Sequence, residues 1–420
     1  MGKTLAEKIL SASSGNPTCE AGDIVWVPVD KAMMDDILGP RIEIAEKMQE
    51  IKDEVWDPEK VVIISDHYTP PASIKQAEIV KFTRQWAADH NVLNYYEYCG
   101  PCHQLMAEHG HVRPGSILVG TDSHTCTGGA FGAFATGIGS TEMAGVLISG
   151  QIWLRVPESI RVSWEGTLSH RVMAKDLSLK TIKAVGHSGA TYKSIEYCGS
   201  TIDAMIMDER MCLSNMAVEM GAKVGLIAAD RETFSFLEEH GVVCDSSMSM
   251  RGDEDAKYCA DYRFQADTLL PQVACPHAVD HVRDVIDIGR IPIHQAYLGS
   301  CTGGRYHDLK AAAELLKGKK IAKNIRLLVS PASDEVWRKA DRAGILSTLA
   351  EAGATILCPT CGVCVGLHSG MLSSGEVCIS ATNRNFIGRM GSTEAEIYLA
   401  SPYTVAASAL TGYICDPRLI

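Results

Sequence analysis

Mainly apolar runs alternate with helical patterns along most of the chain. Residues 60–65 and 116–120 have the composition of strands that are buried on both faces of a sheet, and the segment 73–89 has the periodicity of a long helix. The last third repeats this alternation in the predicted elements 294–298, 308–316, 325–329, 334–350, 355–358 and 377–380. The pattern predicts an α/β fold with parallel sheets, because such strands need helices on both faces.

The first third contains further predicted elements. The opening, 4–12, has the pattern of a short helix, and 23–30 alternates like a strand. A loop at 34–40 leads into a predicted helix at 41–52. The glycine-rich stretch 128–133 is expected to precede another helix.

The length of 420 residues is too great for one hydrophobic core, since domains average about 150 residues. The dipeptide Val156-Pro157 has the character of a boundary, and the strand predicted at 160–166 alternates as if one face were exposed. We therefore expect three α/β domains, which span residues 1–156, 157–275 and 276–420.

The charge balance narrows the range of partners. The chain carries 39 Lys and Arg against 51 Asp and Glu, a formal net charge of −12. This balance argues against a nucleic acid or an anionic membrane as the main partner, although a local basic pocket could still bind an acidic substrate.

The cysteines and the N-terminal segment indicate a reducing compartment. Residues 1–8 lack the apolar region of a signal peptide, and no stretch of about 18 uncharged apolar residues is present. We therefore expect a cytoplasmic protein. Most of its 15 cysteines are then expected to be buried thiols or metal ligands.

Three cysteines at predicted strand ends form the strongest candidate for a metal site. Cys301 follows one predicted strand, and Cys361 and Cys364 follow another in Cys-x-x-Cys spacing. Thiolates select zinc, copper(I) or iron–sulfur clusters, and a structural zinc site usually closes four positions with paired motifs. Three ligands on a four-iron cluster would instead leave one iron open as a Lewis acid. Two alternatives remain from the residues alone: simple buried thiols, or a competing pair of Cys358 with Cys361.

The segment Cys99-Gly100-Pro101-Cys102-His103 imitates two other motifs. Cys-Gly-Pro-Cys suggests a thioredoxin-like dithiol, and Cys-x-x-Cys-His suggests attachment of c-type haem. The segment lacks the sequence context of a thioredoxin, and haem attachment requires export. Neither interpretation is favoured, and a dithiol oxidoreductase is kept as an alternative function.

Acid–histidine sequences occur at two predicted strand ends. Asp66-His67 follows the strand 60–65, and Asp122-Ser123-His124 follows the strand 116–120. An imidazole that is oriented by a carboxylate can hold or move a proton near neutral pH. Since ligand sites of parallel sheets lie beyond the carboxyl ends of the strands, these pairs are candidate catalytic groups.

Arg384 and Arg389 lie five residues apart in a predicted loop. Guanidinium groups bind carboxylates through two parallel hydrogen bonds, so the two residues are a candidate clamp for a dicarboxylate. From the residues alone, two ordinary surface arginines are the simpler interpretation.

Together these motifs resemble the aconitase superfamily over nearly the whole chain. The motifs that carry the resemblance are, in order, Asp66-His67, Cys102-His103-Gln104, 120–125, Asn215-Met216 with 219–222, 299–302, 361–364 and 383–389. The length and the acidic loop before Pro40 are most similar to the large subunits of the 3-isopropylmalate dehydratase and archaeal-type homoaconitase branch.

The resemblance implies three α/β/α domains around a [4Fe-4S] cluster. The cluster ligands would be Cys301, Cys361 and Cys364, with Cys358 as a bystander. The implied carboxylate–imidazole pairs are Asp66–His67, Asp122–His103 and Glu219–His124. The implied substrate-binding residues are Asp35, Gln104, Ser123, Asn215, Arg384 and Arg389.

The resemblance also implies a reaction and a partner. The expected reaction is the dehydration and rehydration of a 2- or 3-hydroxy di- or tricarboxylic acid, with His67 or a neighbouring pair protonating the departing hydroxyl. 3-Isopropylmalate is the expected substrate; homoaconitate hydratase and 2,3-dimethylmalate-type dehydratase are alternatives. A remote alternative is an RNA-binding protein without its cluster, which the charge of −12 disfavours.

Single-chain aconitases continue into a swivelling domain that carries a catalytic serine and a further arginine. This sequence stops at Ile420 without such a domain. The resemblance therefore implies a separate small subunit that supplies both residues and completes the active site.

Three positions depart from the family pattern near the expected substrate pocket. Gly303 stands where many relatives have Asn, Asp35 where they often have an amide or histidine, and Leu38 where they often have threonine. These departures bear on the choice of substrate more than on the class of reaction.

Overall fold

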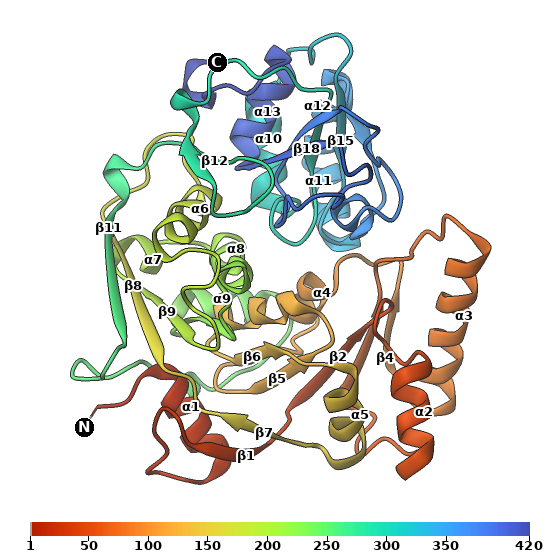
Figure 1. Cartoon of the computed structure of the whole chain (residues 1–420), viewed down its shortest axis with the longest axis vertical. Coiled ribbons are helices and arrows are strands. Elements are labelled where there is room, and N and C mark those ends of the chain that lie inside the picture. Colours follow the sequence, from red (N-terminus) through yellow and green to blue (C-terminus); the bar gives the residue numbers. More distant parts are fainter. Residues whose placement is uncertain (1) are drawn as a thin grey trace. The chain divides into compact units, whose positions relative to one another are not determined.

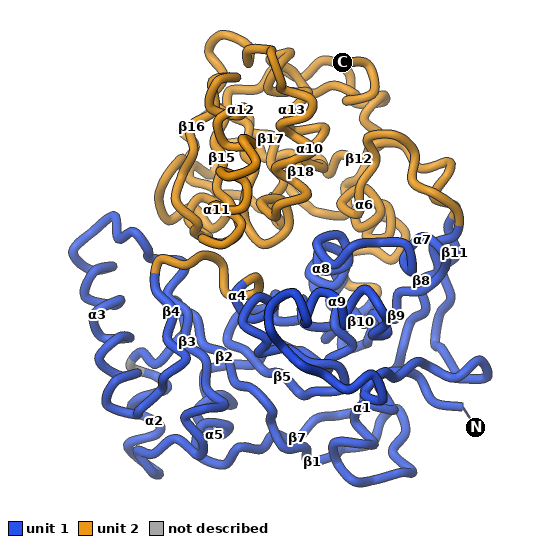
Figure 2. The backbone as a smooth tube through the Cα atoms, turned by 180° about the vertical axis from the view of Figure 1, so that it is seen from behind, with its two compact units in different colours: residues 1–97, 105–165, 190–264 blue, residues 98–104, 166–189, 265–420 orange. Residues whose placement is uncertain are grey.

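A computed structural model describes residues 2–420, and its helices and strands alternate along the chain (Figure 1). The chain forms two compact units (Figure 2). Unit 1 comprises the residues up to Glu97 with Leu105–Glu165 and Ala190–Phe264, and unit 2 comprises Tyr98–Gln104, Gly166–Gly189 and Gln265–Ile420. The division into domains at residues 157 and 276 stays a prediction.

Unit 1 contains sheets of short strands in which parallel pairings predominate. Its strands are β1 (Ile24–Pro28), β2 (Lys31–Asp35), β3 (Val61–Ser65), β4 (Asn94–Glu97), β5 (Ile117–Gly120), β6 (Phe134–Gly137), β7 (Gln151–Arg155), β8 (Ser159–Glu165), β9 (Ser194–Cys198), β10 (Val224–Ile227) and β11 (Ala260–Gln265). Within residues 2–420 they form one sheet in the order β4-β3-β2-β5-β6, another in the order β10-β9-β8-β11, and an antiparallel ribbon of β1 and β7. Every residue of β3 and β5 is buried, as the unbroken apolar runs predicted.

Some helices of unit 1 start at side chains that cap them. The helices of this unit are α1 (Leu5–Ser14), α2 (Ile42–Ile51), α3 (Ile74–Asp89), α5 (Ser140–Ser149), α7 (Ser200–Asp203), α8 (Met207–Met216) and α9 (Arg231–Glu239); α4 (Cys102–Glu108) is divided between the units. Thr4 forms a capping box with Glu7 at the start of α1, and Ser73 caps α3. α2 and α5 pack against each other, and α3 contacts β3. The helices thus cover apolar strands, as expected for α/β layers.

Unit 2 has one large sheet with its own core. Its strands are β12 (Gln272–Ala274), β13 (Val282–Asp284), β14 (Gln295–Leu298), β15 (Arg326–Val329), β16 (Thr355–Ile356), β17 (Val377–Ser380) and β18 (Glu396–Ala400). Its helices are α6 (Ala174–Val185), α10 (Tyr306–Leu316), α11 (Asp334–Arg342), α12 (Ile345–Ala352) and α13 (Pro402–Thr411). The strand order is β13-β12-β18-β17-β14-β15-β16, and helices α10, α12 and α13 share the apolar core with β14 and β15. None of the helices in residues 2–420 combines the length and the apolar character that a bilayer crossing requires.

The structure differs from the sequence predictions at several elements. The predicted loop 34–40 begins inside β2, and the glycine-rich stretch leads into β6 before α5 begins. The single helix predicted at 334–350 is two helices, because Gly344 has a φ of 71° that interrupts the helical hydrogen bonds between α11 and α12. Both missed strands are only four or five residues long, which is too short for a clear period.

Candidate active site

The carboxyl ends of β2 and β5 lie side by side where the strand order of the first sheet reverses. β2 pairs with both β3 and β5, and the chain runs from β2 to β3 and β4 before it reaches β5 and β6. All pairings in this sheet are parallel, so the loops that follow the strands emerge at one edge. Such a reversal is the usual ligand-binding position of an open α/β sheet. Six predicted site residues lie at this edge: Asp35, Asp66, His67, Asp122, Ser123 and His124.

Asp35 ends β2, and its carboxylate organises the loop that follows. The Thr121 hydroxyl donates to Asp35 Oδ2 at 2.7 Å, and the N–H groups of Ile37 and Leu38 donate to Asp35 Oδ1 at 2.6 and 2.9 Å. Burial raises the pKa of Asp35, although His67 acts in the opposite direction. The contacts described here hold the loop, and a contact of Asp35 with substrate stays a prediction.

His67 lies close to several carboxylates. Its Nδ1 is 2.7 Å from Asp66 Oδ1 and 3.4 Å from Asp36 Oδ1, and its Nε2 is 3.9 Å from Asp122 Oδ2. Burial by itself lowers the pKa of His67, but the charge of Asp66 and the contacts with Asp36 and Asp66 outweigh it and raise that pKa well above its usual value. The imidazole is therefore suited to holding a proton at neutral pH.

Asp36 is a residue that the sequence analysis did not single out. It is fully buried, and its carboxylate accepts hydrogen bonds from the backbone N–H groups of His67 and Tyr68, each at 2.9 Å. These bonds join the end of β2 to the turn after β3, so Asp36 positions both the backbone and the ring of His67. In the sequence, the only sign of this role is the acidic pair Asp35-Asp36 after Met33-Met34. The pair indicates a site residue only when 31–35 is recognised as a strand that ends there.

His124 is placed by a 3₁₀ helix, Ser123–Phe131, that begins directly after β5. Asp122 caps this helix, because its Oδ1 accepts the N–H of His124 at 2.6 Å. The ring of His124 meets a carboxylate from far along the chain: its Nε2 is 2.9 Å from Glu219 Oε1, and both side chains are buried. The predicted partners His124 and Glu219 are therefore in contact, while their catalytic role stays a prediction.

Asn215, on α8, is held against the same 3₁₀ helix. It is fully buried, and its Nδ2 donates to Thr127 Oγ1 at 2.8 Å. The helix also packs directly on β10: a Cβ at Gly129 would lie 2.0 Å from the carbonyl oxygen of Gly225. The glycine-rich sequence therefore permits a close approach that fixes Asn215, His124 and Glu219 around one helix.

The sheet of unit 2 has a similar reversal, between β14 and β17. From β14 the chain runs outward to β15 and β16, and it then returns to β17 and β18 on the other side of β14. These pairings are also parallel. The loops after β14, β16 and β17 carry the predicted cysteine and arginine residues at one edge of the sheet.

The side-chain amide of Asn383 connects two of the predicted cluster ligands. Its Nδ2 lies 3.7 Å from Cys301 Sγ, and its Oδ1 lies 3.9 Å from Cys364 Sγ. Cys301 and Cys364 are buried, Cys361 is half-buried, and none of the three forms a disulfide. The three thiols are soft donors on loops at one sheet edge, and two of them contact the same amide. Iron–sulfur clusters are held by thiolates of this kind. The residues present therefore fit such a group.

Cys358 differs from these three cysteines in its surroundings. It is exposed, and its carbonyl oxygen accepts the Ser330 hydroxyl at 2.8 Å. Cys361 begins the 3₁₀ helix Gly362–Val365, within which Cys364 is buried. Burial therefore favours Cys364 over Cys358 as the partner of Cys361.

Gln104 contacts a fully buried arginine of unit 2. Arg305 Nε donates to Gln104 Oε1 at 2.9 Å, and the N–H of Arg305 donates to Asp308 at the start of α10. Arg305 closes the loop that carries Cys301, so it ties Gln104 to that loop. Arg305 could not be singled out from the sequence, since an arginine of unknown burial is usually exposed.

The segment before Gln104 contains two cysteines, Cys99 and Cys102. Cys102 is the first residue of α4, is buried, and has its Sγ 3.6 Å from His103 Nε2. Cys99 and Cys102 form no disulfide. The predicted pair of Asp122 with His103 joins residues of different units and stays a prediction.

Arg384 and Arg389 lie half-buried on the loop after β17. The N–H of Arg389 donates to the carbonyl of Phe386 at 3.0 Å and closes a turn. A Cβ at Gly366 would lie 2.8 Å from the carbonyl oxygen of Arg389, so this loop packs directly on the segment that follows Cys364. The arginines are therefore neighbours of the cysteine loop in sequence and in space.

Gly303 and Leu38 are two of the residues that depart from the family pattern, and the structure shows what surrounds each of them. A Cβ at Gly303 would lie 2.2 Å from Ala381 Cβ, so the loops after β14 and β17 touch where many relatives have a larger residue. Leu38 is 40% exposed and lines a hollow of unit 1 together with Phe82.

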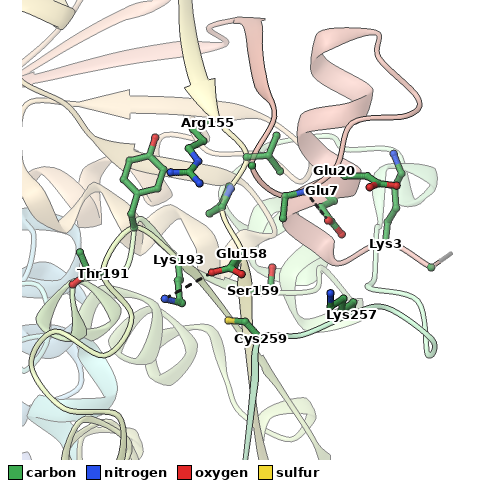
Figure 3. Close-up of a pocket in the computed structure, with 16 residues that line it drawn as sticks. Lys3, Glu7, Glu20, Arg155, Glu158, Ser159, Thr191, Lys193, Lys257 and Cys259 are labelled. Atoms are coloured by element: carbon green, nitrogen blue, oxygen red, sulfur yellow. Dashed lines mark hydrogen bonds and ion pairs between the residues drawn. The ribbon is translucent and has the colours of Figure 1, made fainter.

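Another hollow of unit 1 lies apart from the predicted site residues (Figure 3). It has a volume of about 410 Å³ and is lined by charged groups of both signs, among them Arg155, Lys193, Lys257 and Glu158. Lys193 Nζ lies 3.9 Å from Glu158 Oε2. Since no predicted site residue lines this hollow, it is distinct from the edge at β2 and β5.

Comparison with known proteins identifies the family. The sequence profile of the aconitase family (aconitate hydratase) matches residues 7–288 and 283–412. The chain is 48% identical to 3-isopropylmalate dehydratase large subunit 1 of Methanopyrus kandleri, over 100% of this chain and 99% of that protein. It is 46% identical to the probable 3-isopropylmalate dehydratase large subunit of Methanosarcina mazei, over 99% of this chain and 100% of that protein.

A solved structure supports the fold. Aconitase X of Thermococcus kodakaraensis (holo-form) superposes with a TM-score of 0.50 and 13% sequence identity, covering 90% of this chain and 88% of that chain. At this identity the match concerns the fold alone. The aconitase-type α/β fold and the family resemblance predicted from the sequence are confirmed: the chain belongs to the aconitase family.

Proposed function

We propose that the chain is the large subunit of a 3-isopropylmalate dehydratase, a hydro-lyase that removes water from a hydroxy acid and returns it to the adjacent carbon. The observation that carries this proposal is similarity along the whole chain. Relatives with that name are 42–48% identical, and the alignments cover at least 99% of each of them. Large subunits of homoaconitate hydratase or of a 2,3-dimethylmalate-type dehydratase are the alternatives within the same reaction class.

The proposed cofactor is a [4Fe-4S] cluster held by Cys301, Cys361 and Cys364. The contacts of Asn383 with two of these thiols support this assignment, because a single amide then orients both. Bound there, the cluster would supply a Lewis-acidic iron to the reacting oxygen of the substrate.

In the proposed reaction, unit 1 supplies proton-handling groups. Protonated His67 carries N–H groups at both ring nitrogens: Nδ1 faces the acceptors Asp66 and Asp36, so the proton at Nε2 is the one that it can transfer. Its raised pKa keeps it protonated at neutral pH, so it can donate to a departing hydroxyl group. The His124–Glu219 pair is the second such group.

Unit 2 supplies carboxylate binding in this proposal. Arg384 and Arg389 bind substrate carboxylates, and Gln104, Ser123, Asn215 and Asp35 complete the substrate contacts by analogy with the family. The base that removes the carbon-bound proton and a further arginine come from a separate small subunit. We place the two-subunit enzyme in the cytoplasm, in keeping with 15 cysteines that form no disulfide.

The substrate is tested with the assembled enzyme. The large subunit is reconstituted anaerobically with iron and sulfide, mixed with its small subunit, and offered 3-isopropylmalate, homocitrate and 2,3-dimethylmalate in turn. We expect the highest kcat/KM with 3-isopropylmalate. A preference for homocitrate or dimethylmalate would select the corresponding alternative, and turnover of none would refute the reaction class.

The ligand assignment is tested by four cysteine variants. Cys301→Ser, Cys361→Ser and Cys364→Ser should each abolish the visible absorbance of the reconstituted protein, since each removes one of three anchors. Cys358→Ser is the matched control, because it lies in the same loop as Cys361 and is exposed. Loss of absorbance in Cys358→Ser alone would show that the ligands are misassigned.

A further inference from the structure

Lys175 is a fully buried lysine close to the proposed cluster site. It is the second residue of α6 and is only 1% exposed. Lysine is almost never buried completely, because removal of its ammonium group from water is costly. A methionine of similar length would fill the same space without that cost, so the position of the charge calls for a reason.

The ammonium group of Lys175 joins the two loops that border the sheet reversal in unit 2. Its Nζ lies 2.7 Å from the carbonyl oxygen of Thr382, 3.2 Å from that of Ala381 and 3.3 Å from Thr302 Oγ1. Thr302 follows Cys301 in the loop after β14, and the two carbonyls belong to the loop after β17. Three acceptors match the three N–H groups of an ammonium.

A short chain of contacts leads from Lys175 to the thiols. Thr302 Oγ1 is 3.2 Å from Asn383 Oδ1, and the Asn383 amide contacts Cys301 and Cys364. The carbonyl oxygen of Ala381, 3.0 Å from Thr302 Oγ1, is the alternative acceptor for the single proton of this hydroxyl. Any movement of the Lys175 ammonium group would therefore be transmitted to the amide that orients both cysteines.

The base of Lys175 is itself fixed. The neighbouring Asp176 accepts the N–H of Met173 at 2.9 Å and the N–H of Gln272 in β12 at 2.8 Å. These bonds anchor the first turn of α6 to the sheet of unit 2. A rigid base gives the lysine the constraint that a positioning residue needs.

We propose that Lys175 is a positioning residue for the cluster: it holds the loops after β14 and β17 together around Cys301, Cys364 and Asn383, and its positive charge is linked to the two thiols through Thr302 and Asn383. The inference rests on the proposed function, because it assigns Lys175 a role toward that cofactor. It predicts that the charge and the hydrogen bonds of Lys175 both slow the loss of the cluster.

The test compares Lys175→Met with Lys183→Met in the full-length chain. Lys183 is an exposed lysine of the same helix and serves as the matched control. Each protein is reconstituted anaerobically with iron and sulfide, and the decay of visible absorbance is followed after addition of a chelator. Outer partners of metal ligands typically change affinity by about 10–100-fold, so we expect the cluster of Lys175→Met to decay faster by about that factor, and that of Lys183→Met to decay at the wild-type rate.

Further variants separate positioning from simple stability. Lys175→Arg keeps the charge and should restore part of the retention, and thermal melting of the metal-free proteins reports any general loss of stability. If Lys175→Met does not fold, Thr302→Val replaces it, because it removes the hydroxyl between Lys175 and Asn383; its cluster should also decay faster than that of the wild type.

The outcomes distinguish this inference from the proposed function. If the wild-type protein acquires no cluster under anaerobic conditions, the proposed function fails. If the wild type acquires a cluster and the Lys175→Met cluster, or the Thr302→Val cluster in its place, decays at the wild-type rate, only the inference about Lys175 is overturned.

Discussion

The carboxylate of Asp36 accepts the backbone N–H of His67 at 2.9 Å, and the same oxygen, Oδ1, lies 3.4 Å from the ring atom Nδ1 of His67. One buried acid thus fixes both the main chain and the ring of the proposed proton donor. Together with Asp66 it offsets the effect of burial, which alone would lower the pKa of His67. The protonated state of His67 therefore depends on two carboxylates that follow two neighbouring strands.

We expect Asp36→Asn to shift the pH dependence of the reaction. The amide is similar in shape but carries no charge, so the pKa of His67 should fall. If protonated His67 is the donor, kcat/KM declines as the pH rises above the pKa of His67, and this alkaline limb should move to lower pH in the variant. The measurement is a pH profile of kcat/KM with the assembled enzyme at full cluster occupancy.

The matched control for Asp36→Asn is Asp53→Asn. Asp53 Oδ1 lies 3.1 Å from His90 Nε2, so this pair is an acid–histidine contact of the same unit, with an exposed acid. The control should leave the profile unchanged. An alkaline limb that stays in place in Asp36→Asn would mean that Asp36 has only a structural role.

We expect Glu219→Gln to lower kcat while leaving the cluster intact. His124 Nε2 lies 2.9 Å from Glu219 Oε1, and the amide keeps a hydrogen-bonding partner while it removes the charge that stabilises an imidazolium. Loss of a positioned acid–base group costs about 10²–10⁴-fold in rate, so kcat should fall by at least about 10²-fold with unchanged visible absorbance. Glu239→Gln, an exposed residue of α9, is the control. Wild-type kcat in Glu219→Gln would exclude the pair from proton transfer.

In each unit, the sheet edge that carries the candidate site residues could be predicted, because the strands that end there are continuous apolar runs. Acids and histidines follow directly after the strands predicted at 60–65 and 116–120. The position of Asp66, His67 and Asp122 therefore followed from the strand pattern. The contribution of Asp36 could not be predicted, because it depends on a hydrogen bond across 31 positions and on a five-residue strand without a clear period.

The burial of charged residues also could not be predicted from the sequence. Lys175 and Arg305 belong to a class that is normally exposed, and only their tertiary contacts show that they support the loops of unit 2. The split between α11 and α12 was also missed, since a glycine within a helical pattern is often tolerated and ends the helix only where the chain adopts a positive φ, as at Gly344.

We expect Gly303→Ala to destabilise the protein by about 1–3 kcal/mol, the usual effect of overpacking. The added Cβ would lie 2.2 Å from Ala381 Cβ and 2.7 Å from the Ala381 carbonyl oxygen. The double variant Gly303→Ala with Ala381→Gly should recover part of the loss, because it removes the nearer of these atoms. Thermal melting of the metal-free proteins measures both effects.

The control for Gly303→Ala is Gly145→Ala. Gly145 is in α5, has no positive φ and has no neighbouring atom within 4 Å of the new Cβ. Alanine is preferred to glycine in a helix by about 1 kcal/mol, so this substitution should leave stability unchanged or raise it. A Gly303→Ala protein as stable as Gly145→Ala would show that the loops after β14 and β17 can separate freely.

We expect Asp176 to make unit 2 less stable as the pH rises from about 4 to about 7. Burial raises the pKa of Asp176 to about 7 in the folded protein, against the hydrogen bonds from Gln272 and Met173 that lower it, whereas an unfolded Asp has a pKa of about 3.9. Between these values the folded state binds more protons than the unfolded state, so the free energy of unfolding falls with rising pH and becomes level above pH 7. The full interval corresponds to a loss on the order of 4 kcal/mol at most.

Asp176→Asn should remove this pH dependence, because the amide does not titrate. The melting temperature of the metal-free protein is measured between pH 4 and 8 for the wild type, Asp176→Asn and the control Asp341→Asn, which changes an exposed residue of α11. The wild type and the control should lose stability with rising pH more steeply than Asp176→Asn, even though Asp176→Asn is less stable at low pH because one acceptor of a backbone N–H is replaced. Lys175 directly precedes Asp176 in the anchored turn of α6. Parallel curves for all three proteins would therefore mean that Asp176 stays ionised in the fold and forms a charged pair with Lys175 throughout this range.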